Sequence, residues 1–494
     1  LTAHPLPEVP PQTAMLSVGL WEDAVKRTRA RSAPGICGFR SNELKLLPRG
    51  ALVRLAEIFW QCSKVGPPSN LLLARISVLP KSDSVASVAQ TRPITLIATL
   101  LRLWGGTLTR LILLTWASRI PPGIKGGVPG RAAQDITFYI QTRIEKARAD
   151  CKPIWGFSLD IRKCFNNVPW RPLQEVLRQL QAPSGPVSCW FQALRGLRRV
   201  TYFRGQVGTP RETFTGIPEG DPMSCVGIAA VCWHVHNQLA AFPAEFLAFI
   251  DNWATVSDDP SCLLAAVQRL LECCEALSLP VDWGKSWTWA SDPQAECHWR
   301  DVLREVAPPD GVQRVKRHQV ELGVPFAYHG RAQARQRDRR LCEGHVRLQR
   351  LRSLHRPVAV KAALVQSTVW ASSLYGLEAA LLPLSTVSKL RAAAARAIVG
   401  SSQVRSPWLT LSCLGRRCQD PEVYLLQQCL RAHIRLYRHH PALALECWQR
   451  AVATPSQTVA RGASGPAVVL HTLLHRNGLE IASGGVVTGP GLHR

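Results

Sequence analysis

The sequence has few acidic residues, only two methionines and no long uncharged apolar stretch. Its 494 residues include 34 Asp and Glu against 60 Lys and Arg, so the formal net charge is +26. The hydrophobic content of 46% is that of a folded globular protein and excludes an intrinsically disordered chain. A large positive charge on such a chain indicates a polyanionic partner, nucleic acid first and an anionic membrane surface second.

The longest apolar stretch, from Leu96 to Trp116, contains Arg102 and Arg110 and is typical of an amphipathic helix. A membrane-spanning helix needs about 18 or more consecutive apolar residues with few or no charges. The sequence contains no such run, so we expect no membrane span.

The 16 cysteines follow no paired framework. In a chain of this size they are expected to be reduced thiols, which indicates an intracellular protein of the nucleus and cytoplasm. The set of residues most like a zinc site is Cys413, Cys418, Cys429 and His433. Their spacing fits no common ligand pattern, and the last two also fit one face of a helix.

Hydrophobic periodicity predicts a mixed chain whose middle alternates strands with helices. That order resembles a split βαβ sheet with helices packed on one face, and it predicts an α+β fold. Residues 400–460 are expected to be helical and residues 462–494, rich in glycine, loosely ordered. The predicted helices are 18–29, 46–65, 132–149, 172–180, 223–241, 260–277, 334–354, 358–377 and 386–399, and the predicted strands are 75–81, 154–160, 200–204, 212–214 and 319–324.

Two predicted strands end in a carboxylate. Residues 248–253 read Ala-Phe-Ile-Asp-Asn-Trp, which predicts a strand, a tight turn at Asp251 and a second strand; residues 154–160 are an apolar run ending at Asp160. Either aspartate alone is more simply a turn cap. If the two strands are neighbours, the carboxylates repel each other, and divalent cations relieve that repulsion. Mg²⁺ prefers such a site, with few carboxylates plus phosphates and water.

Two cations flank the polar loop after the first predicted strand. Lys81 follows that strand, and Arg92 precedes Pro93 on the far side of the loop. A lysine and an arginine so placed can hold a triphosphate, Arg as a fork and Lys as a point charge. An ordinary solvated loop is the simpler reading of this segment alone.

In order along the chain, these pieces resemble a reverse transcriptase, in particular the polymerase of non-LTR (LINE-type) retrotransposons and the related group II intron enzymes. The resemblance covers roughly residues 30–400. The segments that carry it are Ser32–Phe39, Leu79-Pro80-Lys81, Arg92-Pro93-Ile94, Phe157–Asn166 around Asp160, Gly216–Ser224 ("G-I-P-E-G-D-P-M-S"), Phe249-Ile250-Asp251-Asn252, Lys285-Ser286 and Glu321–Val324.

The resemblance assigns roles to single residues. Asp160 and Asp251 are expected to bind two Mg²⁺ ions, with Mn²⁺ as a possible substitute, and Asn252 and Lys285 complete the catalytic set. Lys285 is expected near the departing pyrophosphate, although alone it is as well explained as a solvated turn lysine. Phe165 is expected to exclude a ribose 2′-hydroxyl, although it also suits a core position. The nucleotide-binding set is Lys81, Arg92, Phe165, Pro218, Glu219 and Gly220.

The same resemblance implies a right-hand polymerase with fingers, a split βαβ palm, a helical thumb and a helical C-terminal extension. The expected partners are an RNA template, a DNA primer or target DNA, and dNTPs. The expected divisions are an N-terminal segment (1–30), fingers (31–150), palm (151–330), thumb (331–400) and an extension, helical and then Gly-rich (401–494).

Three residues depart from the family pattern and leave the activity open. Asn252 replaces the usual second Asp, Phe249 the usual Tyr and Glu219 the usual Gln. We expect an RNA-directed DNA polymerase whose metal affinity is lowered by Asn252. The alternative is a weakened or inactive RNA-binding relic, or a protein like a splicing cofactor. An RNA-templated RNA polymerase would need a small gate residue, against which Phe165 argues.

Overall fold

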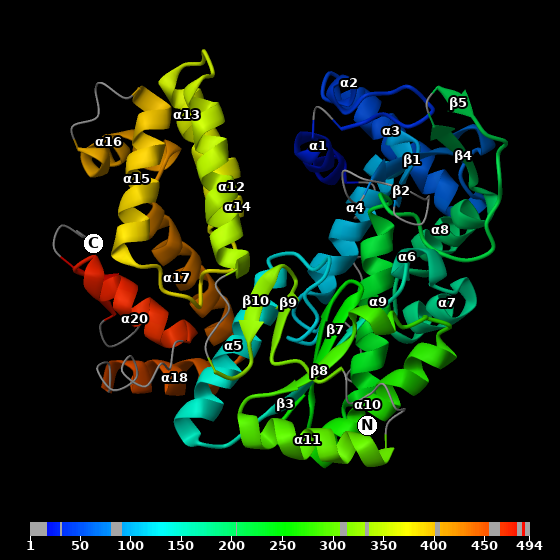
Figure 1. The fold of residues 1–494 in the computed structure, drawn as a ribbon. Helices are drawn as coiled ribbons and strands as arrows, with labels where there is room; N and C mark the ends of the chain where they lie inside the picture. The colour runs from blue at the N-terminus through cyan, green and yellow to red at the C-terminus, as the bar shows by residue number, and fades with distance from the viewer. Residues whose placement is uncertain are drawn as a thin grey trace. The chain divides into compact units, whose positions relative to one another are not determined.

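The computed structural model describes residues 17–29, 32–80, 91–203, 205–306, 314–330, 335–400, 406–453, 465–481 and 487–489. Its mixture of helices and short strands fits the expected α+β fold (Figure 1). The chain divides into two units, residues 1–131, 159–254 and 264–286 in the first and residues 132–158, 255–263 and 287–494 in the second. The linear division expected from the sequence stays a prediction.

The first unit begins with helices around a four-stranded sheet of order β2-β1-β4-β5. Trp21, Phe59 and Trp104 stack in series, with ring centroids 5.5 and 5.7 Å apart, and join three of these helices. The elements are α1 (Val18–Arg27), α2 (Ser41–Leu44), α3 (Arg49–Val65), η2 (Ser69–Leu71), β1 (Leu73–Pro80), β2 (Thr91–Leu96), α4 (Thr99–Trp116), α6 (Cys164–Asn167), α7 (Trp170–Gln179), α8 (Ser184–Gly196), β4 (Arg198–Phe203), β5 (Gln206–Val207), α9 (Met223–Leu239), β6 (Glu245–Phe249) and η4 (Trp283–Lys285).

Helix α9 is the core helix of this unit. It is apolar around most of its circumference, and Val226, Ala229 and Ala230 are fully buried. Small residues such as these let α4 and α7 approach closely, and α9 packs against both. The helix therefore fixes the loop that precedes it, residues 216–222.

A second four-stranded sheet has the order β6-β7-β3-β8. The division between the units passes through two of its strands and through the helix that follows β7. In this order β3 is the neighbour of β7. This is the arrangement that would bring the two strand-end aspartates together. The elements are β3 (Trp155–Asp160), β7 (Asn252–Ser257), α10 (Pro260–Ala276) and β8 (Trp287–Ala290).

The second unit is mostly helical. Its core is formed by residues of α12, η6, α15, α17 and α20, among others, with Val369, Leu390 and Val469 fully buried. The remaining elements are α5 (Ala133–Asp150), α11 (Pro293–Val306), β9 (His318–Glu321), β10 (Val324–Ala327), α12 (Arg335–Arg352), α13 (Val358–Leu364), η6 (Val365–Trp370), α14 (Ala371–Ser373), α15 (Leu384–Val399), α16 (Pro407–Leu414), η7 (Gly415–Arg417), α17 (Pro421–His439), α18 (Pro441–Ala453), α20 (Pro466–Arg476), β11 (Glu480–Ile481) and β12 (Val487–Thr488).

The C-terminal helices pack against α5, far earlier in the chain (Figure 1). Arg435 pairs with Asp135 at 2.6 Å, and Lys146 pairs with Glu446 at 2.6 Å. The carboxylate of Glu145 accepts the backbone N–H groups of Ala467 and Val468 at the start of α20, at 3.0 and 3.1 Å. Helices α17, α18 and α20 are therefore an integral layer of the second unit.

Three local predictions were wrong. Residues 466–476, expected to be loosely ordered, form α20, because the apolar segment from Pro466 to Leu474 overrides the glycine-rich composition around it. The strand that follows β4 in its hairpin is Gln206–Val207, and residues 212–214 form no strand. The strand predicted over 319–324 is a hairpin of β9 and β10, whose turn places Leu322 and Gly323 at φ +46° and +81°.

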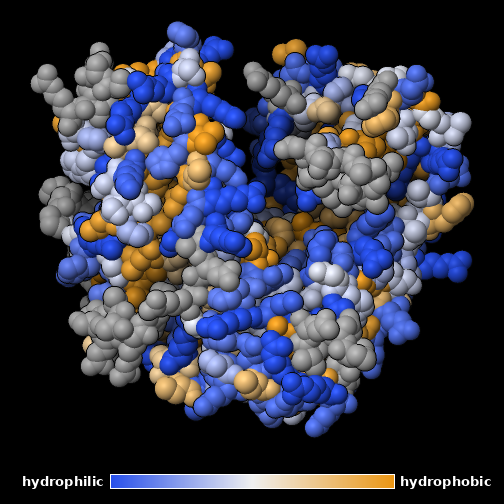
Figure 2. Space-filling model, in the orientation of Figure 1, coloured by the Kyte–Doolittle hydropathy of each residue, from blue (hydrophilic) through white to orange (hydrophobic). Residues whose placement is uncertain are grey.

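The 16 cysteines are free thiols, as expected. None of the helices formed by the described residues is long and apolar enough to cross a membrane. Figure 2 shows hydrophilic side chains over most of the visible face, in keeping with the excess of Lys and Arg.

A buried acid in the second unit predicts a pH-dependent stability. Glu321 is fully buried, and the hydroxyl of Ser158 donates a hydrogen bond to it at 3.0 Å. Burial raises the pKa of Glu321 to about 7, against the opposing hydrogen bonds from Ser158 and Tyr328. Because the folded pKa lies above the unfolded one, the neutral acid stabilises the fold below about pH 4.5, and this contribution is lost as pH rises through 7.

We expect Glu321→Gln, which mimics the neutral acid, to match the parent at about pH 4 and to exceed it at about pH 8.5 by up to about 3 kcal/mol. Denaturant unfolding at both pH values measures the difference, and Glu275→Gln at an exposed position is the matched control. A gain of the same size at both pH values would contradict the assignment.

Candidate active site

The two strand-end aspartates lie at one edge of the β6-β7-β3-β8 sheet. Asp160 is the last residue of β3, and Asp251 lies in the two-residue turn between β6 and β7. The N–H of Ile161 donates to the carbonyl oxygen of Asp251 at 2.9 Å, which holds the two strand ends together. The expected pairing of Asp160 with Asp251 is thus present in the fold.

The turn that carries Asp251 has an unusual backbone. Ile250 has φ +59°, a left-handed conformation that is disfavoured for a β-branched residue. Its carbonyl oxygen accepts a hydrogen bond from the indole nitrogen of Trp253 at 2.9 Å. Contacts around the turn must therefore hold Ile250 in place and, with it, Asp251.

The glycine-rich loop of residues 121–131 is one of those contacts. Its Lys125 N–H donates to the carbonyl of Ala248 at 2.8 Å, and Ala248 N–H donates to the carbonyl of Gly123 at 2.9 Å. Gly126 lies so close to the turn that a Cβ there would be 2.4 Å from the backbone nitrogen of Ile250. The loop of residues 121–131 therefore supports the turn that carries Asp251.

Arg131 closes this loop. Its guanidinium donates to the carbonyl oxygens of Pro121 and Ile124, both at 2.6 Å, and to that of Ile120 at 2.8 Å. It also donates to the carbonyl oxygen of Ala117, the residue that follows α4, at 3.2 Å. The end of a helix leaves such carbonyl groups without partners inside the helix. One side chain therefore ties the end of α4 to the loop that supports Asp251.

Lys285 lies beside Asp160. Its Nζ is 3.1 Å from Asp160 Oδ1 and 3.1 Å from Asp282 Oδ2. Partial burial acts to lower the pKa of Lys285, but hydrogen bonds to Asp160 and Asp282 outweigh it, so the pKa is raised. The lysine is therefore a protonated cation at the edge of the carboxylate pair.

Asp251 is solvent-accessible, yet the surrounding protein still removes part of the hydration of its carboxyl group. This desolvation, and then repulsion by Asp160, raise the pKa of Asp251, while Lys285 and Arg92 act in the opposite direction. The exposure of the Asp251 side chain limits the size of this effect. Charges of Asp160, Lys285 and Arg92 thus all act on Asp251.

The residues expected around the nucleotide are joined mainly through the backbone. Ile217 N–H donates to the carbonyl of Phe165 at 2.7 Å, and Thr95 N–H donates to that of Glu219 at 3.0 Å. Gly220 has φ +108°, and a Cβ there would lie 2.8 Å from the carbonyl oxygen of Thr95, so this position requires glycine.

Pro218, Arg92 and Lys81 complete the expected nucleotide set. Pro218 is buried, and its carbonyl accepts the hydroxyl of Ser224 at 2.9 Å. Arg92 is exposed on β2, opposite Leu79. Lys81 lies outside the described residues.

Sequence reasoning missed two carboxylates near these motifs. Asp221 is buried, accepts the indole N–H of Trp190 at 2.7 Å and the N–H of Met223 at 3.1 Å, and has a pKa raised by burial to about 6. It fixes the start of α9. The second is Asp282, whose carboxylate contacts the same Lys285 ammonium group as Asp160 does. The position of Asp282, three residues before a lysine, was the only signal in the sequence.

The residues present fit a divalent cation. Asp160 and Asp251 repel each other, and the side-chain oxygen of Asn252 is buried without a hydrogen-bond partner among the described residues. Two carboxylates and one amide oxygen suit Mg²⁺, which takes its remaining ligands from phosphates and water. Within the described ranges, no three His, Cys, Asp or Glu side chains gather as a metal cluster, and this includes Cys413, Cys418, Cys429 and His433.

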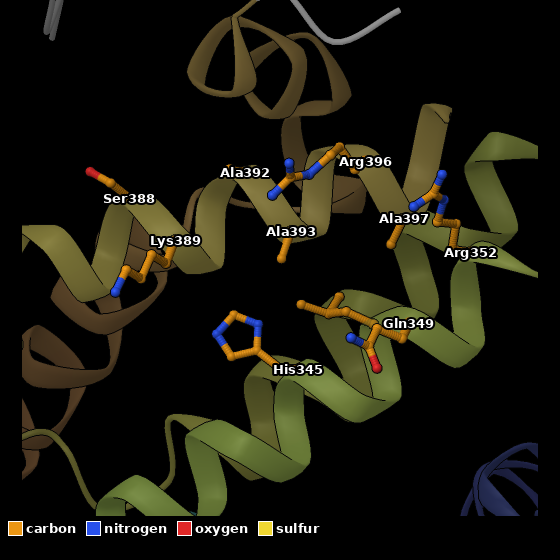
Figure 3. Close-up of a pocket in the computed structure, with 10 residues that line it drawn as sticks. His345, Gln349, Arg352, Ser388, Lys389, Ala392, Ala393, Arg396 and Ala397 are labelled. Carbon is orange, nitrogen blue, oxygen red and sulfur yellow. The ribbon is translucent and has the colours of Figure 1, made fainter. Parts of the chain in front are cut away.

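The second unit carries a basic groove between α12 and α15. Its volume is about 540 Å³. Leu348 and the alanines of α15 form the apolar part of its lining, and exposed cations lie along it. Figure 3 shows side chains of α12 and α15 facing each other across this groove: His345, Gln349 and Arg352 on α12, and Lys389, Ala393 and Arg396 on α15.

Comparison with known families gives one match. Residues 79–317, just under half of the chain, match the family model of the reverse transcriptase (RNA-dependent DNA polymerase). No curated protein matches the chain. The match supports a reverse transcriptase with RNA-directed DNA polymerase activity and implies a palm-type polymerase fold. Such domains bind an RNA template, a primer and dNTPs, and they generally use divalent metals such as Mg²⁺.

Proposed function

We propose that this chain is the RNA-directed DNA polymerase of a non-LTR retroelement and extends a DNA primer, or the 3′ end of a target DNA, on an RNA template. The observation that carries the proposal is the placement of Asp160, Asp251 and Lys285 at one sheet edge, within the segment that matches the reverse transcriptase model. The proposed arrangement is fingers (31–150), palm (151–330) and thumb (331–400), with the extension beyond.

In this proposal Asp160 and Asp251 hold the divalent ions, and the oxygen of Asn252 lies beside them. Two bound Mg²⁺ ions supply Lewis acidity to the primer 3′-hydroxyl and charge neutralisation to the leaving pyrophosphate. Lys285 keeps a positive charge beside Asp160, where it stabilises negative charge that develops on the leaving group. Arg92 and Lys81 bind the triphosphate, and Phe165 excludes a ribose 2′-hydroxyl.

Primer extension tests the activity. The purified full chain is given an RNA template, an annealed DNA primer and dNTPs, with Mg²⁺ or Mn²⁺. We expect extension, and no extension beyond that of Asp251→Asn would overturn the proposal. A nicked DNA duplex offered with an RNA that cannot anneal to it tests target-primed synthesis. Extension of annealed primers alone would remove the non-LTR assignment.

Asn252 favours a second candidate, a protein that binds RNA without polymerase activity. An amide at this position has one unit less negative charge than the carboxylate usual in the resembled family, so metal affinity falls. In that case the Asp160→Asn variant would still bind RNA, with a steep dependence on salt. Neither it nor the parent would extend a primer.

We expect Asn252→Asp to lower the Mg²⁺ concentration needed for half-maximal extension by about tenfold, because a carboxylate replaces a buried amide oxygen that has no partner among the described residues. A Mg²⁺ titration of the extension rate measures this. Asn42→Asp, at an exposed position of α2, is the matched control. An unchanged or higher Mg²⁺ requirement would show that Asn252 does not face the metal.

The groove between α12 and α15 predicts a salt-dependent contact with nucleic acid. Lys389 and Arg396 are exposed along it. If both contact phosphates, Lys389→Glu with Arg396→Glu lowers affinity for an RNA–DNA duplex and reduces the slope of log K against log[salt] by about 2. Lys26→Glu with Arg29→Glu is the control pair. An unchanged slope would place the duplex elsewhere.

A further inference from the structure

The ammonium group of Lys285 is shared by two carboxylates that the backbone holds in a fixed relation. The N–H of Asp282 donates to the carbonyl of Asp160 at 2.8 Å. The hydroxyl of Ser286 accepts the N–H of Asp160 at 3.2 Å and donates to the carbonyl of Asp282 at 2.9 Å. Asp160 and Asp282 are thus fixed relative to each other, while the long side chain between them is 63% exposed and able to turn.

We propose that Asp282 is a positioning residue that retains Lys285 when Asp160 takes a divalent cation. The inference rests on the proposed function, because it assigns Asp160 as a metal ligand. A divalent cation at Asp160 repels an ammonium group 3.1 Å from the same carboxylate. Lys285 releases Asp160 by a side-chain rotation and keeps its contact with Asp282, so no backbone movement is needed. Its positive charge stays beside the site.

Two opposite effects on cation affinity follow from this arrangement. Lys285 competes with a cation for Asp160, so its removal tightens cation binding even though it removes a group that assists the reaction. Asp282 weakens that competition, so its neutralisation loosens cation binding. Because Asp282 acts through Lys285, neutralising Asp282 has little effect once Lys285 is absent. A residue that contributed only its own negative charge would have the same effect in both backgrounds.

A Mn²⁺ binding measurement on the full chain tests the inference. Electron paramagnetic resonance follows the free ion, and no nucleic acid or nucleotide is present. Lys285→Met is expected to tighten Mn²⁺ binding roughly threefold to tenfold, and Asp282→Asn to weaken it roughly threefold, the size expected for exposed charge pairs with a divalent partner. The double variant is expected to match Lys285→Met. Asp160→Asn identifies the signal of this site, and Lys26→Met, at an exposed position of α1, is the control for loss of a lysine.

Equal weakening by Asp282→Asn in both backgrounds would overturn the inference, as would a Lys285→Met variant that binds Mn²⁺ no tighter. Asp282→Ser provides the same comparison if the Asn variant does not fold. The result is independent of the polymerase assay. A chain with this binding pattern but no primer extension refutes the proposed function and keeps the inference, whereas extension with additive binding effects refutes the inference alone.

Discussion

Replacing Asp160 or Asp251 by Asn is expected to lower primer extension on an RNA template by about 1,000-fold or more. Each change keeps the size and shape of the side chain but removes one of the two carboxylates at the edge of the β6-β7-β3-β8 sheet. A factor of 1,000 corresponds to about 4 kcal/mol of transition-state free energy, the scale on which metal-held charge stabilises a reaction. Single-turnover extension at saturating dNTP measures the loss.

Nucleic-acid affinity separates loss of chemistry from loss of structure. Neither aspartate carries positive charge that binds phosphate, so RNA–primer affinity is expected to stay within about twofold of the parent. Asp301→Asn, an exposed α11 residue paired with Arg304, is the matched control and should keep full activity. Extension within tenfold of the parent for either active-site variant would show that the carboxylate pair does not hold the metals.

The sequence predicted the strand-end positions of Asp160 and Asp251 because the apolar runs that form their strands are easy to recognise. An apolar run that stops at a carboxylate marks a strand end, and the order of the motifs made β3 and β7 neighbours. The role of Asp282 did not follow in the same way. A carboxylate three residues before a lysine usually faces solvent. The hydrogen bond from the N–H of Asp282 to Asp160 and the contact of its carboxylate with Lys285 place it at this site.

The helical C-terminal layer shows a different limit of sequence reading. Glycine-rich composition suggested a loose tail, but α20 is stabilised by tertiary contacts, since Glu145 of α5 accepts the first N–H groups of that helix. This contact joins residues 322 positions apart, and the local sequence of neither segment predicts it. Local composition failed here because packing between distant segments decides whether a short helix forms.

Gly126 is the clearest case of a steric requirement that the sequence does not reveal. In the printed sequence it is one of several glycines in residues 121–131, and the turn it contacts is more than a hundred residues further on. A Cβ at this position would lie 2.4 Å from the nitrogen of Ile250 and 2.9 Å from its Cγ1. Backbone nitrogen cannot yield as the end of a flexible side chain can, so the loop or the turn must move.

We therefore expect Gly126→Ala to lower primer extension by about 100-fold, because a displacement of about 1 Å at a catalytic group costs a factor of this size. The overpacking itself should lower the free energy of unfolding by only about 1–3 kcal/mol, so the protein remains folded. Extension rate and Mn²⁺ affinity fall together in this account, since the turn that moves carries Asp251. Denaturant unfolding of the same preparation confirms that the fold survives.

Gly50→Ala is the matched control, because a Cβ there meets no atom within 4 Å and the residue lies in α3. It should keep full activity and gain a little stability from helix propensity. Activity of Gly126→Ala within threefold of the parent would show that the turn tolerates movement. The strained φ of Ile250 would then be incidental to the position of Asp251, and the loop of residues 121–131 would not be needed to hold the Asp251 carboxylate in place.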